Sequence, residues 1–329
     1  MARYIVYGVG AVGGAVGSGL FAAGQDVLFI ARGAQYDALR TNGLRVELPD
    51  GATTHRVPTV SNPAEIDFDP DDIVLMTMKS QDTEGALRTL SDVAWPTTPV
   101  VCLQNGVENE RVATRYFSSV YGAMVITPAT FTAPGVVSVA ASPTIGICDV
   151  GRYPSGSDER NAQLVNDLNK AKWSALIRDD VSRWKYAKLL DNLSNAVQVV
   201  LGLEFRDSRI ASLARAEGVA CLEAAGIDFA SPTEMADRRT RSLVSQPVAG
   251  RERVGSSTWQ SVVRGTGSVE SDYLNGEVAL LGRLCGVATP VNVLLQRISN
   301  AAARQHREPG VMTEAEFLEH LERGTTPLR

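Results

Sequence analysis

Short runs of apolar, mostly β-branched residues recur along the first half of the chain, separated by glycine-rich or helix-capable segments. Because these runs are apolar throughout rather than alternating, they predict parallel strands covered on both faces by helices. They lie at residues 4–7, 27–30, 73–76 and 100–103. Residues 44–48 alternate instead and lead into Pro49-Asp50-Gly51, which indicates an antiparallel excursion. The pattern is that of a doubly wound α/β sheet, with its last strands within residues 121–150.

The pattern changes to helical periodicity after about residue 180. Apolar residues recur at steps of three and four within residues 182–203, which predicts one long core helix. A later apolar stripe ends at Gly286, and Thr289-Pro290 then caps a second helix. The sequence therefore predicts a Rossmann-type doubly wound sheet followed by an all-helical C-terminal domain, with the boundary between residues 179 and 180.

A glycine-rich motif follows the first predicted strand. Residues 8–13, Gly-Val-Gly-Ala-Val-Gly, match G-x-G-x-x-G and stand between a strand and a helix-capable segment. The three glycines permit a tight turn, the approach of backbone N–H groups to a pyrophosphate, and close packing of helix on strand. The alternative is a glycine-rich packing helix, but the strands before and after the motif favour a dinucleotide site. We expect it to comprise Gly8, Gly10, Ala11, Val12 and Gly13.

Arg32 follows the second predicted strand, where the identity of the residue decides the form of the cofactor. A carboxylate at this position accepts hydrogen bonds from the ribose 2′-OH, whereas an arginine favours a 2′-phosphate. Asp26 precedes the strand and is expected at the wrong end. Although a surface arginine is the plain alternative, Arg32 favours NADP(H), so residues 1–179 are expected to form an NADP(H)-binding domain.

Composition narrows the class of protein. The chain has 329 residues, 44% hydrophobic and 21% charged, and a net charge of -5, which argues against nucleic acid as a partner. Four separated cysteines without a CxxC pair suit reduced thiols in the cytoplasm, and three histidines offer no metal site. We expect neither a secretory signal at the glycine-rich start nor a membrane span.

Hydride transfer to a ketone needs a proton donor, and the few histidines lie outside motif-like segments. Lysine is scarce, with five among 32 lysines and arginines, and a partly desolvated lysine can release a proton where arginine cannot. Lys188, Asn192 and Asn195 are spaced as one polar stripe on an apolar helix. Such a stripe is either a solvated face or a pocket wall. The nearby Lys185 is expected to be a neutral control for Lys188.

Glu270 stands four residues before Leu274, on the side of a predicted helix that faces inward. A buried carboxylate needs a partner, such as the Lys188 ammonium or a substrate hydroxyl. Complementarity with the helix N-terminus explains it equally well, because Glu270 would lie in the first turn.

Four segments spread over nearly the whole chain carry motifs of one family. They read GVGAVGG at 8–14, LQNGVENE at 103–110, WKYAKLLDN at 184–192 and SVESDYLNGEVALLGRLCGVATPVN at 268–292. The chain resembles the ketopantoate reductase (2-dehydropantoate 2-reductase) family in these segments. The resemblance implies an NADPH-binding Rossmann domain joined to a helical domain, with 2-oxo acid reduction in the cleft between them.

The same resemblance implies roles for individual residues. Lys188 is the general acid that protonates the keto oxygen, and Glu270 hydrogen-bonds the hydroxyl and orients the ammonium. The remaining implied contacts are those of Asn105 and Asn192 with substrate and nicotinamide ribose, of Ser257 with the substrate carboxylate, and of Lys79 with the cofactor.

The departures from the family pattern lie on the substrate side. Family members usually have a second asparagine eight residues after the lysine, where this chain has Ala196, and Asn195 stands one position early as a substrate-binding candidate. The run SSTWQS around Ser257 replaces the family's SMLQD, and the spacing from Ser257 to Glu270 is one residue longer. The reaction type is therefore better supported than the substrate.

We expect NADPH-dependent reduction of a 2-oxo acid to a 2-hydroxy acid, with 2-dehydropantoate as the first substrate to test. The alternatives are a related reductase of a different 2-oxo acid and a non-catalytic NADP(H)-binding sensor. Residues 180–329 are expected to form the helical substrate and catalytic domain. The expected partner is a small molecule rather than nucleic acid or membrane, and a homodimer is left open.

Overall fold

The computed structural model describes residues 2–251 and 255–323. It divides the chain into two compact units, the first comprising Met1–Lys185 with Ser231–Arg253 and the second Tyr186–Ala230 with Val254–Arg329. These units differ from the two domains predicted with one boundary between residues 179 and 180, because the chain returns to the first unit after residue 230. Within the described ranges, no helix has the length and apolar character needed to cross a membrane.

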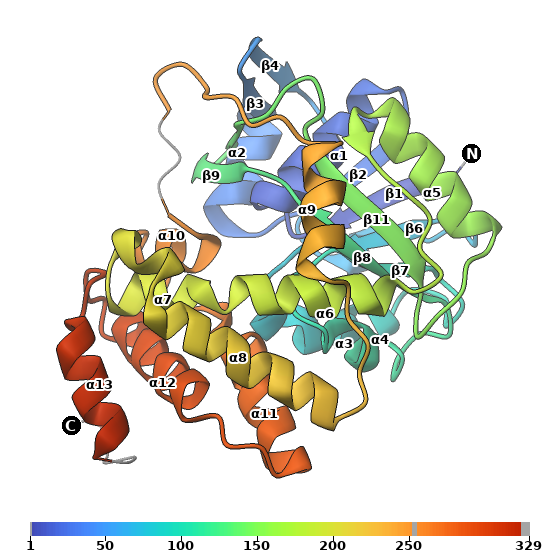
Figure 1. The fold of residues 1–329 in the computed structure, drawn as a ribbon. Helices are drawn as coiled ribbons and strands as arrows, with labels where there is room; N and C mark the ends of the chain where they lie inside the picture. The colour runs from blue at the N-terminus through green and yellow to red at the C-terminus, as the bar shows by residue number, and fades with distance from the viewer. Residues whose placement is uncertain (1, 252–254, 324–329) are drawn as a thin grey trace. The chain divides into compact units, whose positions relative to one another are not determined.

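The first unit is built on an eight-stranded sheet (Figure 1). In sheet order its strands are β12 (Trp173–Ser174), β11 (Gly146–Arg152), β8 (Val120–Ile126), β7 (Val100–Cys102), β6 (Ile73–Met76), β1 (Arg3–Tyr7), β2 (Asp26–Ile30) and β5 (Thr59–Val60). Neighbouring strands are parallel except β8 and β11. The predicted doubly wound sheet is confirmed.

A second, four-stranded sheet lies in the same unit. Its order is β4 (Gly51–His55), β3 (Leu44–Leu48), β10 (Val136–Val139) and β9 (Ala129–Ala133). The β3 and β4 strands pair antiparallel with Leu48 opposite Gly51, which confirms the excursion predicted around Pro49-Asp50-Gly51.

Helices cover both faces of the large sheet. Tyr4 and Val6 of β1 pack into one core, together with apolar residues of α1 (Ala11–Ala22) and α5 (Glu159–Lys170). Ile5, between them, packs into the opposite core with residues of α3 (Thr83–Ser91) and α4 (Asn109–Ala113). Successive side chains of a strand point to opposite faces, so a strand buried on both sides must be apolar throughout. The remaining helical segments of the unit are α2 (Gly33–Asn42), α9 (Pro232–Thr240), η1 (Pro63–Glu65) and η2 (Ser80–Asp82).

The return of the chain to the first unit is fixed by a buried ion pair. Arg238 of α9 donates hydrogen bonds to both carboxylate oxygens of Asp149, a fully buried residue of β11. Arg178 donates a further bond to the same carboxylate. A buried carboxylate is costly unless it is paired, so this pairing holds α9 against the sheet.

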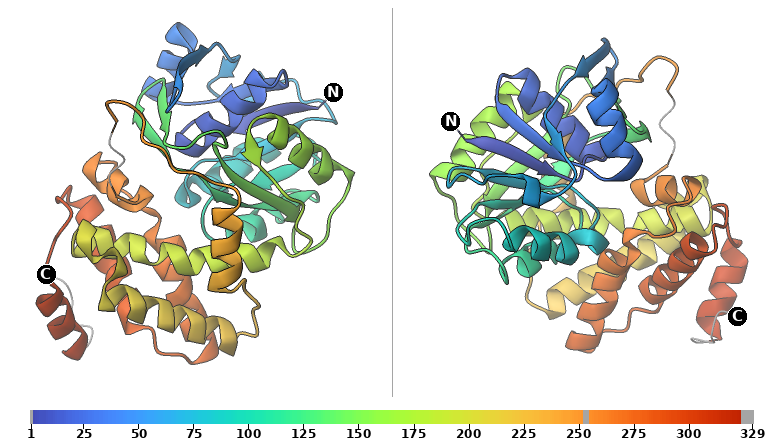
Figure 2. Two further views of the ribbon diagram at one scale, coloured as in Figure 1. Left: turned by 45° about the horizontal axis from the view of Figure 1, so that its top comes forward. Right: turned by 180° about the vertical axis from the view of Figure 1, so that it is seen from behind.

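The second unit consists of helices, as predicted for the C-terminal part. They are the second half of α6 (Val181–Asn192), α7 (Ser194–Val200), α8 (Arg209–Ala224), α10 (Ser257–Val263), α11 (Asn275–Cys285), α12 (Pro290–Arg304) and α13 (Glu314–Glu322), with the short turns η3 (Leu203–Asp207) and η4 (Glu270–Tyr273). Figure 2 shows α11, α12 and α13 in orange to red. Gly286 ends α11 in the left-handed conformation at φ 73°, and Pro290 opens α12, both as predicted.

The single helix predicted over residues 182–203 is confirmed only in part, since it is interrupted at Leu193, which has φ −61° and ψ −31°, and ends at Val200. The structure has α6 (Val181–Asn192) followed by α7, with a one-residue break at Leu193. The carbonyl of Leu193 accepts a hydrogen bond of 3.2 Å from the side chain of Asn275. A donor from another helix thus satisfies a backbone group at the break, which the local periodicity does not reveal.

Candidate active site

The glycine-rich loop connects β1 to α1 in the arrangement that the motif predicts. Gly8 has φ +98°, and a Cβ there would lie 2.7 Å from the backbone nitrogen of Met78, so a side chain is excluded. A Cβ at Gly13 would overlap the Gly8 carbonyl and the Thr77 hydroxyl, which itself donates to the Gly8 carbonyl at 2.6 Å. Close approach of loop, helix and β6 therefore requires glycine at both positions.

Gly10 occupies the N-cap of α1 and differs from its neighbours in having open space around it. A Cβ built there has no atom within 4 Å. The backbone N–H groups of Ala11, Val12 and Gly13 belong to the first turn, where a helix leaves its donors without intrahelical acceptors. Open space beside such donors suits an approaching phosphate.

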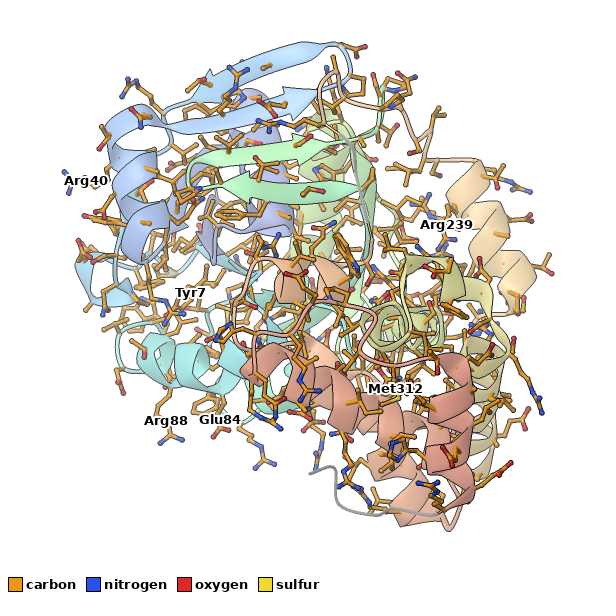
Figure 3. The ribbon with its side chains drawn as sticks, turned by 90° about the vertical axis from the view of Figure 1, so that its left-hand side faces the viewer. Tyr7, Arg40, Glu84, Arg88, Arg239 and Met312 are labelled. Carbon is orange, nitrogen blue, oxygen red and sulfur yellow. The ribbon has the colours of Figure 1, made fainter. Side chains whose placement is uncertain are left out.

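A cavity of 550 Å³ adjoins this loop at the carboxyl ends of β1, β2 and β6. Tyr7, labelled in Figure 3, lines it directly before the loop. The other lining residues include Gly8, Gly10, Arg32, Gln35, Thr77, Met78, Lys79, Asp82 and Phe131. Ligands of doubly wound sheets bind at these strand ends. Four predicted cofactor residues, Gly8, Gly10, Arg32 and Lys79, are thus brought to one cavity.

Arg32 lies at the N-cap of α2 with its side chain 74% exposed. Its guanidinium stands 3.6 Å from the carboxylate of Asp82 across the cavity lining. A surface pair of this kind contributes little to stability, so the guanidinium is available to a stronger anion such as a 2′-phosphate. Asp26 is the first residue of β2, at the opposite end of the strand from Arg32.

Asn105 lies in the loop after β7, and its backbone is held by a buried polar network. Its carbonyl accepts hydrogen bonds from Ser80 at 3.1 Å and from the amide of Asn109 at 3.0 Å. Thr83 links the amides of Gln104 and Asn109. These bonds fix the loop rigidly, which is what a residue that contacts a bound molecule needs.

The residues of the first unit therefore fit a dinucleotide. The cradle at Gly10 has room for a pyrophosphate, backbone donors open into it, and a guanidinium lies beyond the second strand where a 2′-phosphate would bind.

Lys188 and Asn192 lie on α6, one helical turn apart, and Asn195 follows on α7. The side-chain nitrogen of Asn192 is buried and, among the described residues, has no hydrogen-bond partner. A buried amide donor without an acceptor is costly, so this atom points to a ligand acceptor. Asn195 is 7% exposed, and its carbonyl accepts a bond from the Ser256 hydroxyl at 3.4 Å.

Glu270 is 7% exposed and opens η4 rather than α11. Its predicted position in the first turn of the later helix is wrong, because Leu274 leaves helical geometry with φ −115° and ψ −88° and separates the two segments. Complementarity with the dipole of α11 is therefore not the explanation for this carboxylate.

Ser257 is the first residue of α10, directly after the capping residue. The neighbouring Ser256 is buried and accepts a bond from the backbone of Trp259 as the N-cap, while its own N–H donates to the Gln198 side chain at 2.9 Å. Ser257 is half-buried, and its carbonyl accepts from Ser261. Of the two serines, Ser257 is the one whose hydroxyl is not needed for the cap.

Lys185, expected to be a neutral control, is 5% exposed and forms a buried ion pair with Glu110, which is 2% exposed. Its ammonium also donates to the carbonyl of Gln104 at 3.3 Å. This burial argues against a small effect on substitution, since removing one partner leaves an uncompensated buried charge.

The candidate residues thus divide between the two units. The glycine loop, Arg32, Lys79 and Asn105 belong to the first, and Lys188, Asn192, Asn195, Ser257 and Glu270 to the second. Within the described ranges, no group of three or more His, Cys, Asp and Glu side chains is arranged to hold a metal ion.

Comparison with known families accounts for most of the chain. A family model described as ketopantoate reductase PanE/ApbA matches residues 4–154, and one described as ketopantoate reductase PanE/ApbA C terminal matches residues 180–303. The chain belongs to the ketopantoate reductase family. Both matches lie in the order expected from the sequence motifs.

Relatives of known name agree with this family. A 2-dehydropantoate 2-reductase of Pyrococcus horikoshii is 28% identical over 308 residues, covering 91% of this chain and 97% of that protein. The crystal structure of a PanE/ApbA family ketopantoate reductase from Ralstonia eutropha JMP134 is 25% identical with a TM-score of 0.77, covering 92% of this chain and 99% of that one. D-mandelate dehydrogenase in complex with NADH and anilino(oxo)acetate has the same TM-score and coverage at 21% identity, a likeness of fold alone.

Sequence reasoning missed two supports of the site in this member of the ketopantoate reductase family. Gln35 donates to the carbonyl of Val9 at 2.8 Å and accepts from the N–H of Gly135, which ties the glycine loop to the small sheet. The second support is Asn275 and Asn292, which are joined by a 3.0 Å hydrogen bond. Both lie within the segment 268–292, but nothing in the sequence indicates which residues they bind. Only distant contacts reveal these roles.

A half-buried carboxylate completes the second support. Glu217 of α8 accepts bonds from the backbone N–H groups of Val291 and Asn292, each 2.9 Å long, and from the Asn292 side chain. Burial raises the pKa of Glu217, while these three bonds oppose the rise. Glu217 thereby caps the start of α12 and orients Asn292, which orients Asn275 toward the break at Leu193.

Proposed function

We propose that the protein catalyses the NADPH-dependent reduction of a 2-oxo acid to a 2-hydroxy acid, with 2-dehydropantoate as the leading substrate and pantoate as its product. The observation that carries this proposal is the placement of Lys188 one helical turn from Asn192. The buried side-chain nitrogen of Asn192 has no acceptor among the described residues. Both ketopantoate reductase family models match the chain, one on each side of residue 179.

The first unit binds the cofactor in this proposal. The N–H groups at the start of α1 receive the pyrophosphate beside Gly10, and Arg32 and Lys79 bind the 2′-phosphate side. Asn105, held by Ser80 and Asn109, contacts the nicotinamide ribose. The region up to residue 179 is the cofactor-binding part, and residues 180–329 supply the groups that handle the substrate.

Bound NADPH supplies the hydride that is transferred to the C2 carbon of the oxo acid. The ammonium of Lys188 donates a proton to the carbonyl oxygen, so that a C–H and an O–H bond replace the C=O π bond and the lysine is left neutral until water reprotonates it. Glu270 accepts a hydrogen bond from the new hydroxyl and orients the ammonium of Lys188. Asn192 donates to the substrate, and Ser257 binds its carboxylate.

The substrate side of the site favours a broader choice of oxo acid than in relatives with the full motif. Ala196 is 1% exposed and replaces a side chain that is able to hydrogen-bond a substrate hydroxyl. A site discriminates strongly for a hydroxyl only when its protein partner is present. We therefore propose weaker preference for ketopantoate over analogues without its terminal hydroxyl.

The test compares kcat/KM for ketopantoate and for 2-oxo-3-methylbutanoate in one preparation, following NADPH absorbance. Turnover of both within about tenfold supports the broad specificity. A preference of several orders of magnitude for ketopantoate overturns the broad specificity and leaves ketopantoate reduction itself. Tight NADPH binding without turnover of any 2-oxo acid overturns the proposed reaction in favour of a sensor, a role that has no need of a proton-donating lysine.

Two further properties belong to this proposal. Cys102, Cys148, Cys221 and Cys285 are all free thiols, which supports a reducing compartment and hence the cytoplasm. A homodimer remains a prediction that sedimentation equilibrium would test.

A further inference from the structure

The first turns of α6 are seated directly on the large sheet of the first unit. Gly122 of β8 and Gly151 of β11 stand opposite each other in the strand register. A Cβ at Gly151 would overlap the carbonyl of Arg178 and lie 3.0 Å from the Cβ of Val181, the first residue of α6. A Cβ at Gly122 would lie 3.1 Å from the carboxylate of Glu110. This glycine pair makes room for the start of α6 and for Glu110.

Lys185, one turn after Val181, holds the start of α6 in the space beside Gly122 and Gly151. Its ammonium pairs with Glu110 and donates to the carbonyl of Gln104, the residue before Asn105. Both charged side chains are almost fully buried, at 5% and 2% exposed, beside the buried thiol of Cys102. Burial and then the Glu110 charge raise the pKa of Cys102 well above its ordinary value, so this sulfur stays an uncharged neighbour of the pair.

The position of this pair on the helix is what gives it a further role. Lys185 is the last residue of the first unit and Tyr186 the first of the second, so the boundary falls inside α6. Lys188 lies three residues beyond Lys185, about 4.5 Å along the same helix. Any shift or rotation of α6 at Lys185 is therefore passed to Lys188 through a continuous helix.

We propose that the buried Lys185–Glu110 pair is a positioning pair, which fixes the start of α6 against the Gln104–Asn105 loop and thereby sets the position of Lys188. The inference rests on the proposed role of Lys188. The pair links two of the four sequence segments, LQNGVENE and WKYAKLLDN, by a contact between residues 75 positions apart. Neither residue is proposed to touch the substrate.

The test must separate positioning from simple stabilisation. Lys185→Met keeps the length of the side chain but removes its charge, and Lys185→Met/Glu110→Leu removes both charges, which in a buried pair often restores stability. Lys185→Arg keeps the positive charge but changes the shape of the charged group. Lys170→Met is the matched control, because Lys170 is 54% exposed in its ion pair with Asp167 on α5.

We expect Lys185→Met to lower kcat about 10- to 100-fold, the loss that a displacement of about 1 Å causes, with the Kd for NADPH within threefold of the parent. The double variant recovers Tm but not kcat, Lys185→Arg recovers most of kcat, and Lys170→Met leaves kcat unchanged, although its partner Asp167 is only 6% exposed and Tm falls. Recovery of kcat together with Tm in the double variant would show that the pair only balances charge, and would overturn the proposal. A folded Lys185→Met variant with kcat within twofold of the parent would do the same.

Hydrogen exchange of the 181–192 peptide provides a readout that does not depend on turnover. Faster exchange in Lys185→Met and in the double variant than in the parent supports the pair as the anchor of α6, and unchanged exchange overturns it. If the parent chain reduces no 2-oxo acid, the proposed function fails, and the exchange data still decide whether the pair fixes the helix. Glu110→Gln replaces Lys185→Met if the latter does not fold.

Discussion

The side chain of Asn275 donates a 3.2 Å hydrogen bond to the backbone carbonyl of Leu193, at the single residue that separates α6 from α7. Asn275 is fully buried and also donates to the side chain of Asn292. One amide nitrogen thus serves two buried acceptors, and each would lose this bond if the nitrogen were removed.

Asn275→Ala is therefore expected to destabilise the protein by about 1–3 kcal/mol, since two buried hydrogen bonds are lost and each contributes about 0.5–1.5 kcal/mol. The measurement is urea unfolding of parent and variant. Asn300→Ala serves as the control, because the Asn300 side chain bonds Asp272 at an exposed position. A loss below about 1 kcal/mol for Asn275→Ala would mean that the break at Leu193 does not depend on this bond.

The glycine loop offers a pair of substitutions with opposite expectations. Gly10→Ala places a methyl group in open space at φ −89°, so unfolding free energy should change by no more than about 1 kcal/mol, the cost of alanine at an N-cap. The same methyl group obstructs the pyrophosphate, and the Kd for NADPH should rise about tenfold or more, or about 1.4 kcal/mol.

Gly13→Ala should behave in the opposite way. Its methyl group overlaps the Gly8 carbonyl and the Thr77 hydroxyl, so we expect a loss of about 1–3 kcal/mol in stability without any cofactor present. Thermal unfolding and NADPH titration of both variants check the contrast. Equal stability of the two variants would contradict the packing argument.

Arg32→Ala is expected to raise the KM for NADPH by about one to two orders of magnitude and to leave the KM for NADH nearly unchanged. The reason is that a charge-assisted bond to a phosphate contributes about 1.5–3 kcal/mol. Asp82→Asn is the control, since it removes the competing carboxylate 3.6 Å away and should not weaken NADPH. Equal use of both cofactors by the parent protein would refute the assignment of Arg32.

Lys188→Ala should lower kcat by about 10²–10⁴-fold while the protein folds and binds NADPH normally, because general acid catalysis typically contributes that factor. Steady-state kinetics and NADPH titration measure the two effects. Lys185 is unsuitable as a control because it is buried, whereas Lys170→Ala removes an exposed lysine. A normal rate in Lys188→Ala would assign the proton donor elsewhere.

Part of the stability at neutral pH should come from Glu234, which accepts two hydrogen bonds of 2.9 and 2.8 Å from Arg183, and this part should be lost in acid. The hydrogen bonds from Arg183, and then those from Ser231, lower the pKa of Glu234 from 4.5 to about 2. A carboxylate whose pKa is lower in the folded state stabilises the fold at any pH above its pKa in the unfolded state. This stabilisation is lost as the pH falls through its pKa in the folded state.

The matching experiment compares the Tm of the parent and of Glu234→Gln between pH 7 and pH 2. The variant should unfold at lower temperature at pH 7, and the difference should shrink from about pH 4.5 downward. A difference that stays constant over this range would mean that the charge of Glu234 does not contribute.

The sequence predicts features that depend on neighbouring residues and misses those that depend on contacts between residues far apart in the chain. Strands such as Ile73–Met76 are visible because burial on both faces leaves a local apolar run, and the loop at Gly8 is visible because its backbone demands glycine. The break at Leu193 is not visible, since its donor stands 82 residues later. The burial of Lys185 is equally hidden, because its partner lies 75 residues earlier.

The return of Arg238 to Asp149 also bears on how the chain can be cut. A fragment ending at residue 154, the end of the first family match, would keep Asp149 in its sheet. It would lack Leu176, Arg178 and Arg238, which together donate four hydrogen bonds to the Asp149 carboxylate. Such a fragment would leave the buried Asp149 carboxylate without these partners. The first unit is therefore an assembly of two chain segments and not a piece that can be cut off at residue 154.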